Sequence, residues 1–319
     1  MVFVGSKKNK ETKFKLKEHK IIIVRRIVQI TAFLLINYII LEWIFGINLT
    51  ALDGLVKLLP ILNSPRNPLS TGAGITEYTF FSMAEGIFPF LLIAIFFLVT
   101  LTTNRWFCGW ICPIGTIQDG CAAIPTKKRT LKPKWHKFLL NIKYAILIFL
   151  VIMTFSLGVS KTVNYFYYLE FKQALGALAE MPVGFFSLSE FLFVYFPQVV
   201  SDLFMTGTWP DFGGMIILLI YVIILITSFW VPRFYCRYIC PYAAIASSVS
   251  DYSFLKLSRN PVKCVGRSEC GICENVCPKQ IKILDEPFEF FTGNGECNLC
   301  LKCKEKCPHD AMYIKFGNV

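Results

Sequence analysis

Long runs of apolar residues, separated by polar and basic segments, dominate the first 258 residues of the chain. A membrane-spanning helix needs about 20 mostly apolar residues, and four stretches approach or reach this length. They are residues 27–45, 84–102, 138–157 and 214–231. The pattern therefore predicts an α-helical membrane bundle with four transmembrane helices.

A fifth apolar stretch, 183–200, is interrupted by Ser187, Ser189, Glu190 and Pro197. Because polar residues and proline interrupt its apolar run, we expect an interfacial or re-entrant segment there rather than a span. The first 26 residues are basic, and no small-residue cleavage site follows the first apolar run. They are therefore expected to form a basic tail and not a cleaved signal peptide.

Composition agrees with a membrane protein, because 55% of the residues are hydrophobic and only 17% are charged, against about 25% charged in soluble domains. Lys and Arg are unevenly distributed. Nine lie in residues 1–26, seven in 103–137 and twelve after the fourth span, whereas loops 46–83 and 158–213 hold two each. Since Lys and Arg accumulate in cytoplasmic loops, we predict a multi-pass protein of the cell membrane with both termini in the cytoplasm.

The net charge of +12 follows from this topology, and basic segments near a membrane attract anionic lipid head groups. Membrane lipids are therefore an expected partner. No motif of a nucleic-acid-binding fold accompanies the charge, so we expect no nucleic-acid partner.

Eight of the last 56 residues are cysteines, and they form two runs. The second run has the C-x2-C-x2-C-x3-C-P spacing of bacterial two-cluster ferredoxins. In the first run, five residues and not two separate the first cysteine from the second. The spacing predicts two 4Fe-4S clusters. A four-thiolate zinc site and disulfides fit the pattern less well. The runs are Cys264, Cys270, Cys273 and Cys277, and Cys297, Cys300, Cys303 and Cys307.

In the ferredoxin fold the fourth cysteine of each run binds the cluster of the other run. β-like stretches, 281–284 and 312–315, follow the two runs, so we predict a duplicated α+β domain over residues 259–319. Because the domain is small, its clusters must contribute much of its folding free energy. The predicted cluster ligands are Cys264, Cys270, Cys273 and Cys307 for one cluster, and Cys297, Cys300, Cys303 and Cys277 for the other.

A second cysteine pattern follows the second and fourth predicted spans. Residues 105–113 and 233–241 share the order Arg, two aromatic residues, Cys, any residue, an aromatic residue, Ile, Cys and Pro, 128 positions apart. Both spans run in the same direction, so the pattern predicts a parallel two-span repeat. A C-x3-C spacing places two sulfurs on one helix face, and two such faces would gather four thiols. These thiols belong to Cys108, Cys112, Cys236 and Cys240.

Three roles remain open for the four membrane thiols. They are suited to bind a third cluster or another soft metal ion, to act as redox-active dithiols, or to pack as small buried residues. The aromatic residues of the two motifs would either wall a quinone pocket or form the interfacial aromatic belt. They are Trp106, Phe107, Trp110, Phe234, Tyr235 and Tyr238.

Haem is not expected, because the three histidines, His19, His136 and His309, are not placed as paired axial ligands within spans. The sequence contains no C-x-x-C-H, G-x-G-x-x-G or P-loop motif. The predicted organisation is thus a basic tail (1–26), a four-span membrane domain (27–258) and a cytoplasmic ferredoxin domain (259–319).

The combination of four spans, two C-x3-C-P motifs and two C-terminal ferredoxin motifs resembles the NapH-type membrane iron–sulfur proteins, which are related to MauN and to the membrane core of NosR. The resemblance implies a subunit that passes electrons between a quinol or cytoplasmic donor and partner redox subunits, which could carry flavin or haem. It does not imply a stand-alone enzyme. The CcoG type shares both parts and is implicated in copper handling, so a metal-handling maturation factor using the C-x3-C-P thiols is the alternative.

Overall fold

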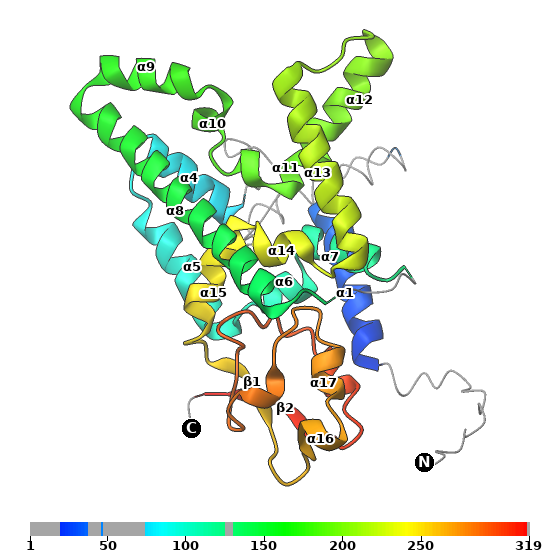
Figure 1. The fold of residues 1–319 in the computed structure, drawn as a ribbon. Helices are drawn as coiled ribbons and strands as arrows, with labels where there is room; N and C mark the ends of the chain where they lie inside the picture. The colour runs from blue at the N-terminus through cyan, green and yellow to red at the C-terminus, as the bar shows by residue number, and fades with distance from the viewer. Residues whose placement is uncertain (1–19, 38–45, 47–73, 125–129, 318–319) are drawn as a thin grey trace.

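The structure is a computed structural model that describes residues 20–37, 46, 74–124 and 130–317. Its helices form an elongated bundle, and the cysteine-rich C-terminal region lies at one end of that bundle (Figure 1). The predicted basic tail up to residue 19 and the second half of the first predicted span, 38–45, lie outside the described residues. The mostly helical architecture agrees with the prediction.

Three helical stretches are long and apolar enough to cross a membrane: α8 (Pro133–Val163), Leu188–Met205 and α13 (Phe212–Trp230). Large apolar side chains on their outer faces are exposed, including Ile152 on α8 and Ile223 on α13. Extensive exposed apolar surface is unfavourable in water and suits contact with lipid. These helices therefore support a membrane protein.

The first two predicted spans are only partly matched by helices in the described residues. α1 (Lys20–Ile36) covers the first half of one, and α5 (Phe90–Thr103) begins later than residue 84, where the other was predicted to start. The delay has a local cause, because Gly86 has φ +79° and Pro89 directly precedes α5. A separate helix, α4 (Ile75–Ala84), precedes this break.

The stretch 183–200, for which we expected an interfacial or re-entrant segment, is helical from Leu188 onward. Here α11 (Leu188–Glu190), the π-helical turn η3 (Phe191–Tyr195) and α12 (Phe196–Met205) follow one another directly. Pro197 has no N–H to donate to the preceding turn. The wider π turn before it changes the backbone hydrogen-bond pattern of the helix at that point. By length and composition the stretch is a candidate span.

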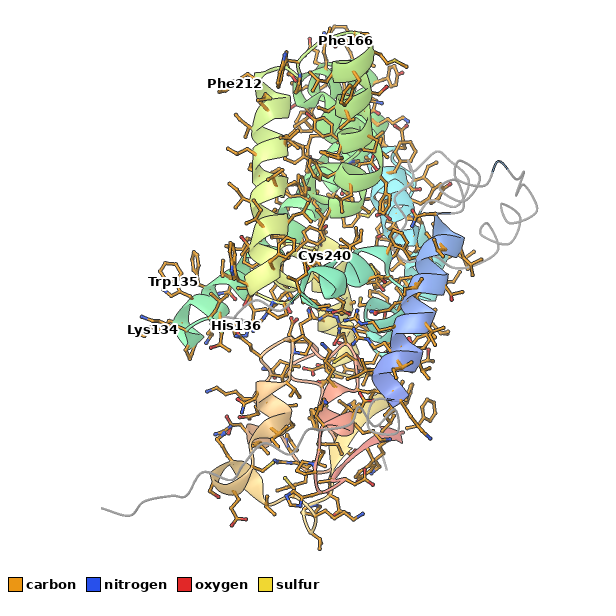
Figure 2. The ribbon with its side chains drawn as sticks, turned by 90° about the vertical axis from the view of Figure 1, so that its right-hand side faces the viewer. Lys134, Trp135, His136, Phe166, Phe212 and Cys240 are labelled. Carbon is orange, nitrogen blue, oxygen red and sulfur yellow. The ribbon has the colours of Figure 1, made fainter. Side chains whose placement is uncertain are left out.

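Shorter helices connect the long ones. α9 and α10 lie at the end of the bundle that is remote from the cysteine-rich region (Figure 1), and the labelled Phe166 and Phe212 mark this end in Figure 2. The connecting helices are α6 (Trp106–Trp110), α7 (Pro113–Cys121), α9 (Tyr165–Leu175), α10 (Ala177–Glu180), η2 (Gly184–Phe186), α14 (Phe234–Tyr238) and α15 (Pro241–Ser250).

The C-terminal region contains an antiparallel pair, β1 (Leu255–Arg259) and β2 (Met312–Phe316), in which Leu255 lies opposite Phe316. The predicted strand at 312–315 is confirmed. The one predicted at 281–284 is wrong: β1 pairs with β2, and a 3-10 turn forms at Ile283–Asp285 (η4). The predicted boundary between 258 and 259 falls inside β1. The remaining helices are α16 (Gly266–Glu269), α17 (Ile272–Asn275) and α18 (Lys302–Glu305).

The bundle and the C-terminal region share a packed core where they meet. Trp110 of α6 packs in one apolar cluster with Leu257, Cys297 and Leu299 of the C-terminal region. α1 also contacts α18, where the backbone N–H of Ile22 donates to Glu305 Oε1 at 3.1 Å. The two parts of the chain are thus held together by apolar packing and by hydrogen bonds.

Candidate metal centres

The four membrane cysteines occupy equivalent local positions. Cys108 lies in α6 and Cys112 is the residue before α7, while Cys236 lies in α14 and Cys240 is the residue before α15. The expectation that each pair shares one continuous helix face is wrong. The residue before a proline is biased toward extended backbone, and ψ is 123° at Cys112 and 116° at Cys240, which starts a new helix after each.

The four thiols nevertheless meet, as predicted. Cys108, Cys112, Cys236 and Cys240 all line one small cavity at the base of the bundle. Cys240 lies between the long helices and the C-terminal region (Figure 2). The turn before each proline, and not a shared helix face, brings the two sulfurs of each motif to the cavity.

The surroundings of these thiols bear on the choice between metal binding and thiol exchange. Gln118 Nε2 donates to Cys236 Sγ at 3.1 Å, and the backbone amide of Ala243 faces the Cys240 sulfur. Burial and the neighbouring Cys236 raise the pKa of the Cys240 thiol to about 12. A buried thiol with a raised pKa is a poor nucleophile, whereas a coordinating metal deprotonates a thiol outright.

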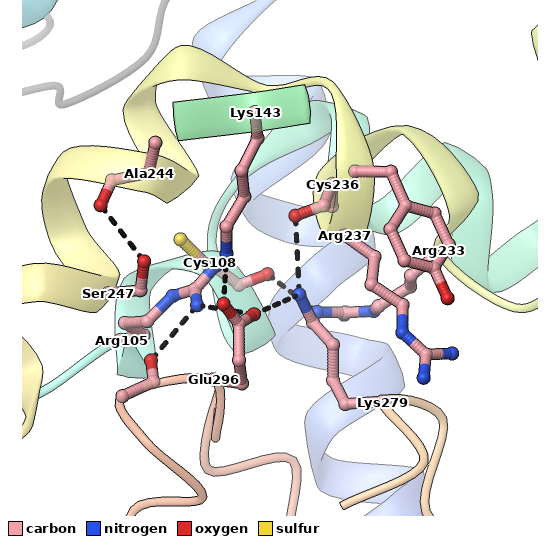
Figure 3. A network of polar contacts seen from close by, with 12 residues as sticks. Arg105, Cys108, Lys143, Arg233, Cys236, Arg237, Ala244, Ser247, Lys279 and Glu296 are labelled. Carbon is pink, nitrogen blue, oxygen red and sulfur yellow. Dashed lines mark hydrogen bonds and ion pairs between the residues drawn. The ribbon is translucent and has the colours of Figure 1, made fainter. Parts of the chain in front are cut away.

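A buried cationic cluster lies next to the four thiols, because Arg105 and Lys279 line the same cavity as the cysteines. Figure 3 shows this cluster around Glu296. Arg105 Nη1 lies 3.1 Å and Lys279 Nζ 3.7 Å from Glu296 Oε2, and Lys143 Nζ pairs with Glu296 Oε1. Lys279 also donates to the Cys236 carbonyl at 3.2 Å. Although burial opposes the effect, the three cations lower the pKa of Glu296 to about 2.

The equivalent arginine of the second motif has a different partner. Arg233 donates to both carboxylate oxygens of Asp119 on α7, at 2.9 and 2.6 Å, and to the Cys108 carbonyl at 3.1 Å. Arg25 of α1 pairs with the same carboxylate, and Gln29 donates to it at 2.9 Å. This network joins the two cysteine motifs to each other and to α1.

Positive charge exceeds negative charge around the four thiols. Among the described residues, the two networks contain five cationic side chains that are at least 97% buried and two carboxylates that are at least 92% buried. Buried charge without compensation is strongly unfavourable. Four thiolates that hold a cluster form an anion, so such a group would fit the charge of this site. The cations are Arg25, Arg105, Lys143, Arg233 and Lys279, and the carboxylates are Asp119 and Glu296.

The eight C-terminal cysteines gather in the two groups predicted. One group lines a single cavity together with Arg259, and we call it the outer set: Cys264, Cys270, Cys273 and Cys307. The other group, the inner set, is centred on Cys300, which lies close to the other three cysteines, and it consists of Cys277, Cys297, Cys300 and Cys303. The long gap after Cys264 forms the short helix α16 and does not remove this cysteine from its group. Ligation itself stays a prediction.

The two sets differ in burial and in neighbours. Three members of the inner set are buried, whereas the members of the outer set are half-buried. The inner set lies against the first membrane motif, because Trp110 Nε1 donates to the Leu299 carbonyl at 2.9 Å and Gly109 packs on the Asn298 carbonyl. The inner set is therefore the one next to the membrane thiols.

In the described part of the chain, no three His, Cys, Asp or Glu side chains converge closely enough for one metal ion.

The predicted roles of the motif aromatics are not supported. Tyr235 and Tyr238 are buried, and the Tyr235 hydroxyl donates to the Phe186 carbonyl at 2.7 Å. Trp106 stacks on Trp110, which faces the C-terminal region. Packing within the protein thus holds these rings, where we expected a quinone pocket or an interfacial belt.

Sequence comparison agrees with this arrangement. Residues 85–132 and 213–259 match the family described as a 4Fe-4S binding domain, so both C-x3-C-P segments are included. Ferredoxin from Methanothermococcus thermolithotrophicus is 32% identical over 53 residues, which cover 17% of this chain and 87% of that ferredoxin. The chain belongs to this 4Fe-4S binding family.

Longer relatives of this 4Fe-4S protein include YccM of Escherichia coli, 28% identical over 222 residues that cover 68% of this chain and 53% of YccM. The regulatory protein NosR of Pseudomonas aeruginosa is 26% identical over 216 residues, or 63% of this chain and 24% of NosR. The predicted resemblance to NosR is thereby confirmed. The chain spans about half of YccM and a quarter of NosR. No solved structure matches the chain.

Proposed function

We propose that the chain is a membrane electron-transfer subunit that carries three iron–sulfur clusters. The outer and inner cysteine sets would each hold a 4Fe-4S cluster, and the four membrane cysteines would hold a third. The main support for this proposal is that the inner set packs directly on the first membrane motif, through contacts of Trp110 and Gly109. Bound clusters would supply one-electron oxidation and reduction at each set.

The chain's own residues hold the inner set against both membrane motifs. Lys279, two positions after Cys277, donates to the carbonyl of Cys236 in the membrane motif. Glu296, one position before Cys297, pairs with Arg105, three positions before Cys108. The outer set is half-buried, which suits exchange with a partner there.

The proposed membrane topology has four spans arranged as a parallel repeat of two. The two family matches, 85–132 and 213–259, support the repeat. So does the recurrence of a long apolar helix, a five-residue helix and a helix begun by proline in α5–α7 and α13–α15. The Lys and Arg distribution supports a cytoplasmic C-terminal region.

The proposed donors are membrane quinol or a cytoplasmic reductant, and the proposed acceptors are partner redox subunits. The name of YccM provisionally assigns that relative to electron transport, which supports this role. Copper transfer through the membrane thiols is the second candidate, since soft thiolates also suit Cu(I).

Anaerobic purification followed by iron and sulfide analysis tests the proposal. Two clusters require about eight irons and three about twelve, and each should give a reduced-state electron paramagnetic resonance signal. Stoichiometric Cu(I) that depends on Cys108 and Cys240, without iron at those thiols, would instead support metal transfer. Protein without iron in any set would refute the electron-transfer function.

A further inference from the structure

An apolar cavity of about 270 Å3 lies between α4, α5, α8 and α15. This is close to the lower end of the range, about 300 Å3, for pockets that hold small molecules. Phe97 on α5 and Val151 on α8 line it and are also exposed on the outer surface. The cavity is therefore accessible from the side of the bundle that would face lipid. Its polar lining residues are Thr76 and Thr79.

Two aromatic rings separate this cavity from the four membrane thiols. Phe96 lines the apolar cavity, and its ring meets the Tyr242 ring edge to face, with centroids 5.5 Å apart. Tyr242 in turn lines the cavity of the four cysteines. A redox-active molecule in the apolar cavity would thus lie one pair of contacting rings away from the proposed membrane cluster.

A second cavity lies beside Glu77, the residue after Thr76, between α4 and residues 181–190. The Thr76 hydroxyl donates to Glu77 Oε2 at 2.9 Å, and Glu77 is 6% exposed. Glu77 and Glu190 of α11 line this cavity with Ser187, and its described lining residues include no Lys or Arg. A buried carboxylate without a cation is costly, so this pair is suited to take up a proton.

We propose that the apolar cavity binds the ring of a lipid-soluble quinol and that Glu77 accepts a proton from it. This inference rests on the proposed electron-transfer function. Oxidation of one quinol to quinone releases two electrons and two protons. Clusters held by the cysteine sets would accept these electrons one at a time. The protons pass to the Glu77 and Glu190 carboxylates. A lipid acyl chain would fit the apolar walls alone, but it would need neither the adjacent thiols nor the carboxylates.

Binding is tested first with the full holoprotein in detergent. Val151→Phe fills the cavity, and Ile152→Phe is its control, because Ile152 is the next residue of α8, is exposed and does not line the cavity. We expect Val151→Phe to weaken binding of decylubiquinone at least tenfold, measured by quenching of tryptophan fluorescence. Ile152→Phe should bind normally, and both variants should retain their iron. Equal binding by the two variants, or stable occupancy by phospholipid that decylubiquinone does not displace, would overturn the site.

Proton acceptance is tested by the pH profile of iron reduction. Glu77→Gln should bind decylubiquinone normally and be reduced normally by dithionite, yet its reduction by decylubiquinol should slow at least tenfold and lose the wild-type dependence on pH. Glu190 is the titratable group that faces Glu77 from α11, so Glu190→Gln should shift the profile without abolishing it. An unchanged profile in Glu77→Gln would overturn the role of Glu77. Absence of dithionite-reducible iron in the wild type would refute the proposed function, independently of quinone binding.

Discussion

Gly109 of the first membrane motif lies so close to the Asn298 carbonyl oxygen that a methyl group at position 109 would overlap it. Gly109 follows Cys108, and Asn298 follows Cys297. One backbone contact therefore connects the residue after a membrane thiol to the residue after an inner-set thiol. Position 109 therefore requires glycine, which has no side chain, for the two backbone segments to come this close.

Gly109→Ala is expected to push the helical bundle and the C-terminal region apart at this contact. Overpacking at a rigid contact costs about 1–3 kcal/mol, and the separation should slow electron exchange between the membrane and inner sets. The measurement is the rate at which the inner-set signal appears after rapid mixing with a reductant, together with the unfolding midpoint. Gly120→Ala is the control, because nothing lies within 4 Å of a methyl group there. Equal rates in Gly109→Ala and wild type would contradict the contact's role.

Glu296→Gln should loosen the junction between the bundle and the C-terminal region. Removing the negative charge leaves Arg105, Lys143 and Lys279 buried without their shared carboxylate. Breaking a buried ion pair in this way costs about 3–5 kcal/mol. Hydrogen exchange of residues 292–300 should increase, and limited proteolysis should cut there sooner.

The matched control for that change is Arg267→Gln. Arg267 is about half exposed and pairs with Glu274 and Asp285 at the surface, where solvent screens ion pairs. Its loss should leave exchange at the junction unchanged. If the two variants behaved alike, the Glu296 cluster would not be what holds the junction.

Cys112→Ser should remove about four irons while it leaves the two ferredoxin signals in place, because four-iron clusters need all four thiolates. Cys112 lines the membrane cavity and is remote in sequence from both C-terminal sets. Cys121, at the end of α7 and outside the pattern, is the control, and Cys121→Ser should retain all iron. Iron content that is the same in Cys112→Ser and wild type would show that the membrane thiols hold no cluster.

The sequence was informative where the deciding pattern is local or repeated. The grouping of the C-terminal cysteines follows from spacings of a few residues, and the meeting of Cys108 with Cys240 follows from a motif that recurs 128 positions later. Both could be predicted without coordinates. The helix break at each cysteine could also have been read from the following proline.

The charged networks could not be predicted, because their partners are far apart in the chain. Arg105 and Lys143 lie 191 and 153 positions from Glu296, and no periodicity links them. Burial of Glu296 depends on the docking of two regions that the sequence describes separately. The apolar cavity is equally a product of packing among four helices, so its residues look like ordinary apolar helix positions.

The same chemical change should have different consequences in the outer and inner sets. Cys264→Ser affects a half-buried group that lines a cavity with Arg259, so it should remove about four irons without disturbing the bundle. Cys297→Ser affects a buried residue in the core shared with Trp110. Loss of that cluster should also expose Trp110 and shift its fluorescence to longer wavelength. The comparison requires both variants to be prepared anaerobically and corrected for iron content. A red shift of equal size in both would contradict the placement of the inner set against the membrane motif, since Trp110 donates to the carbonyl of Leu299, which lies between two cysteines of that set.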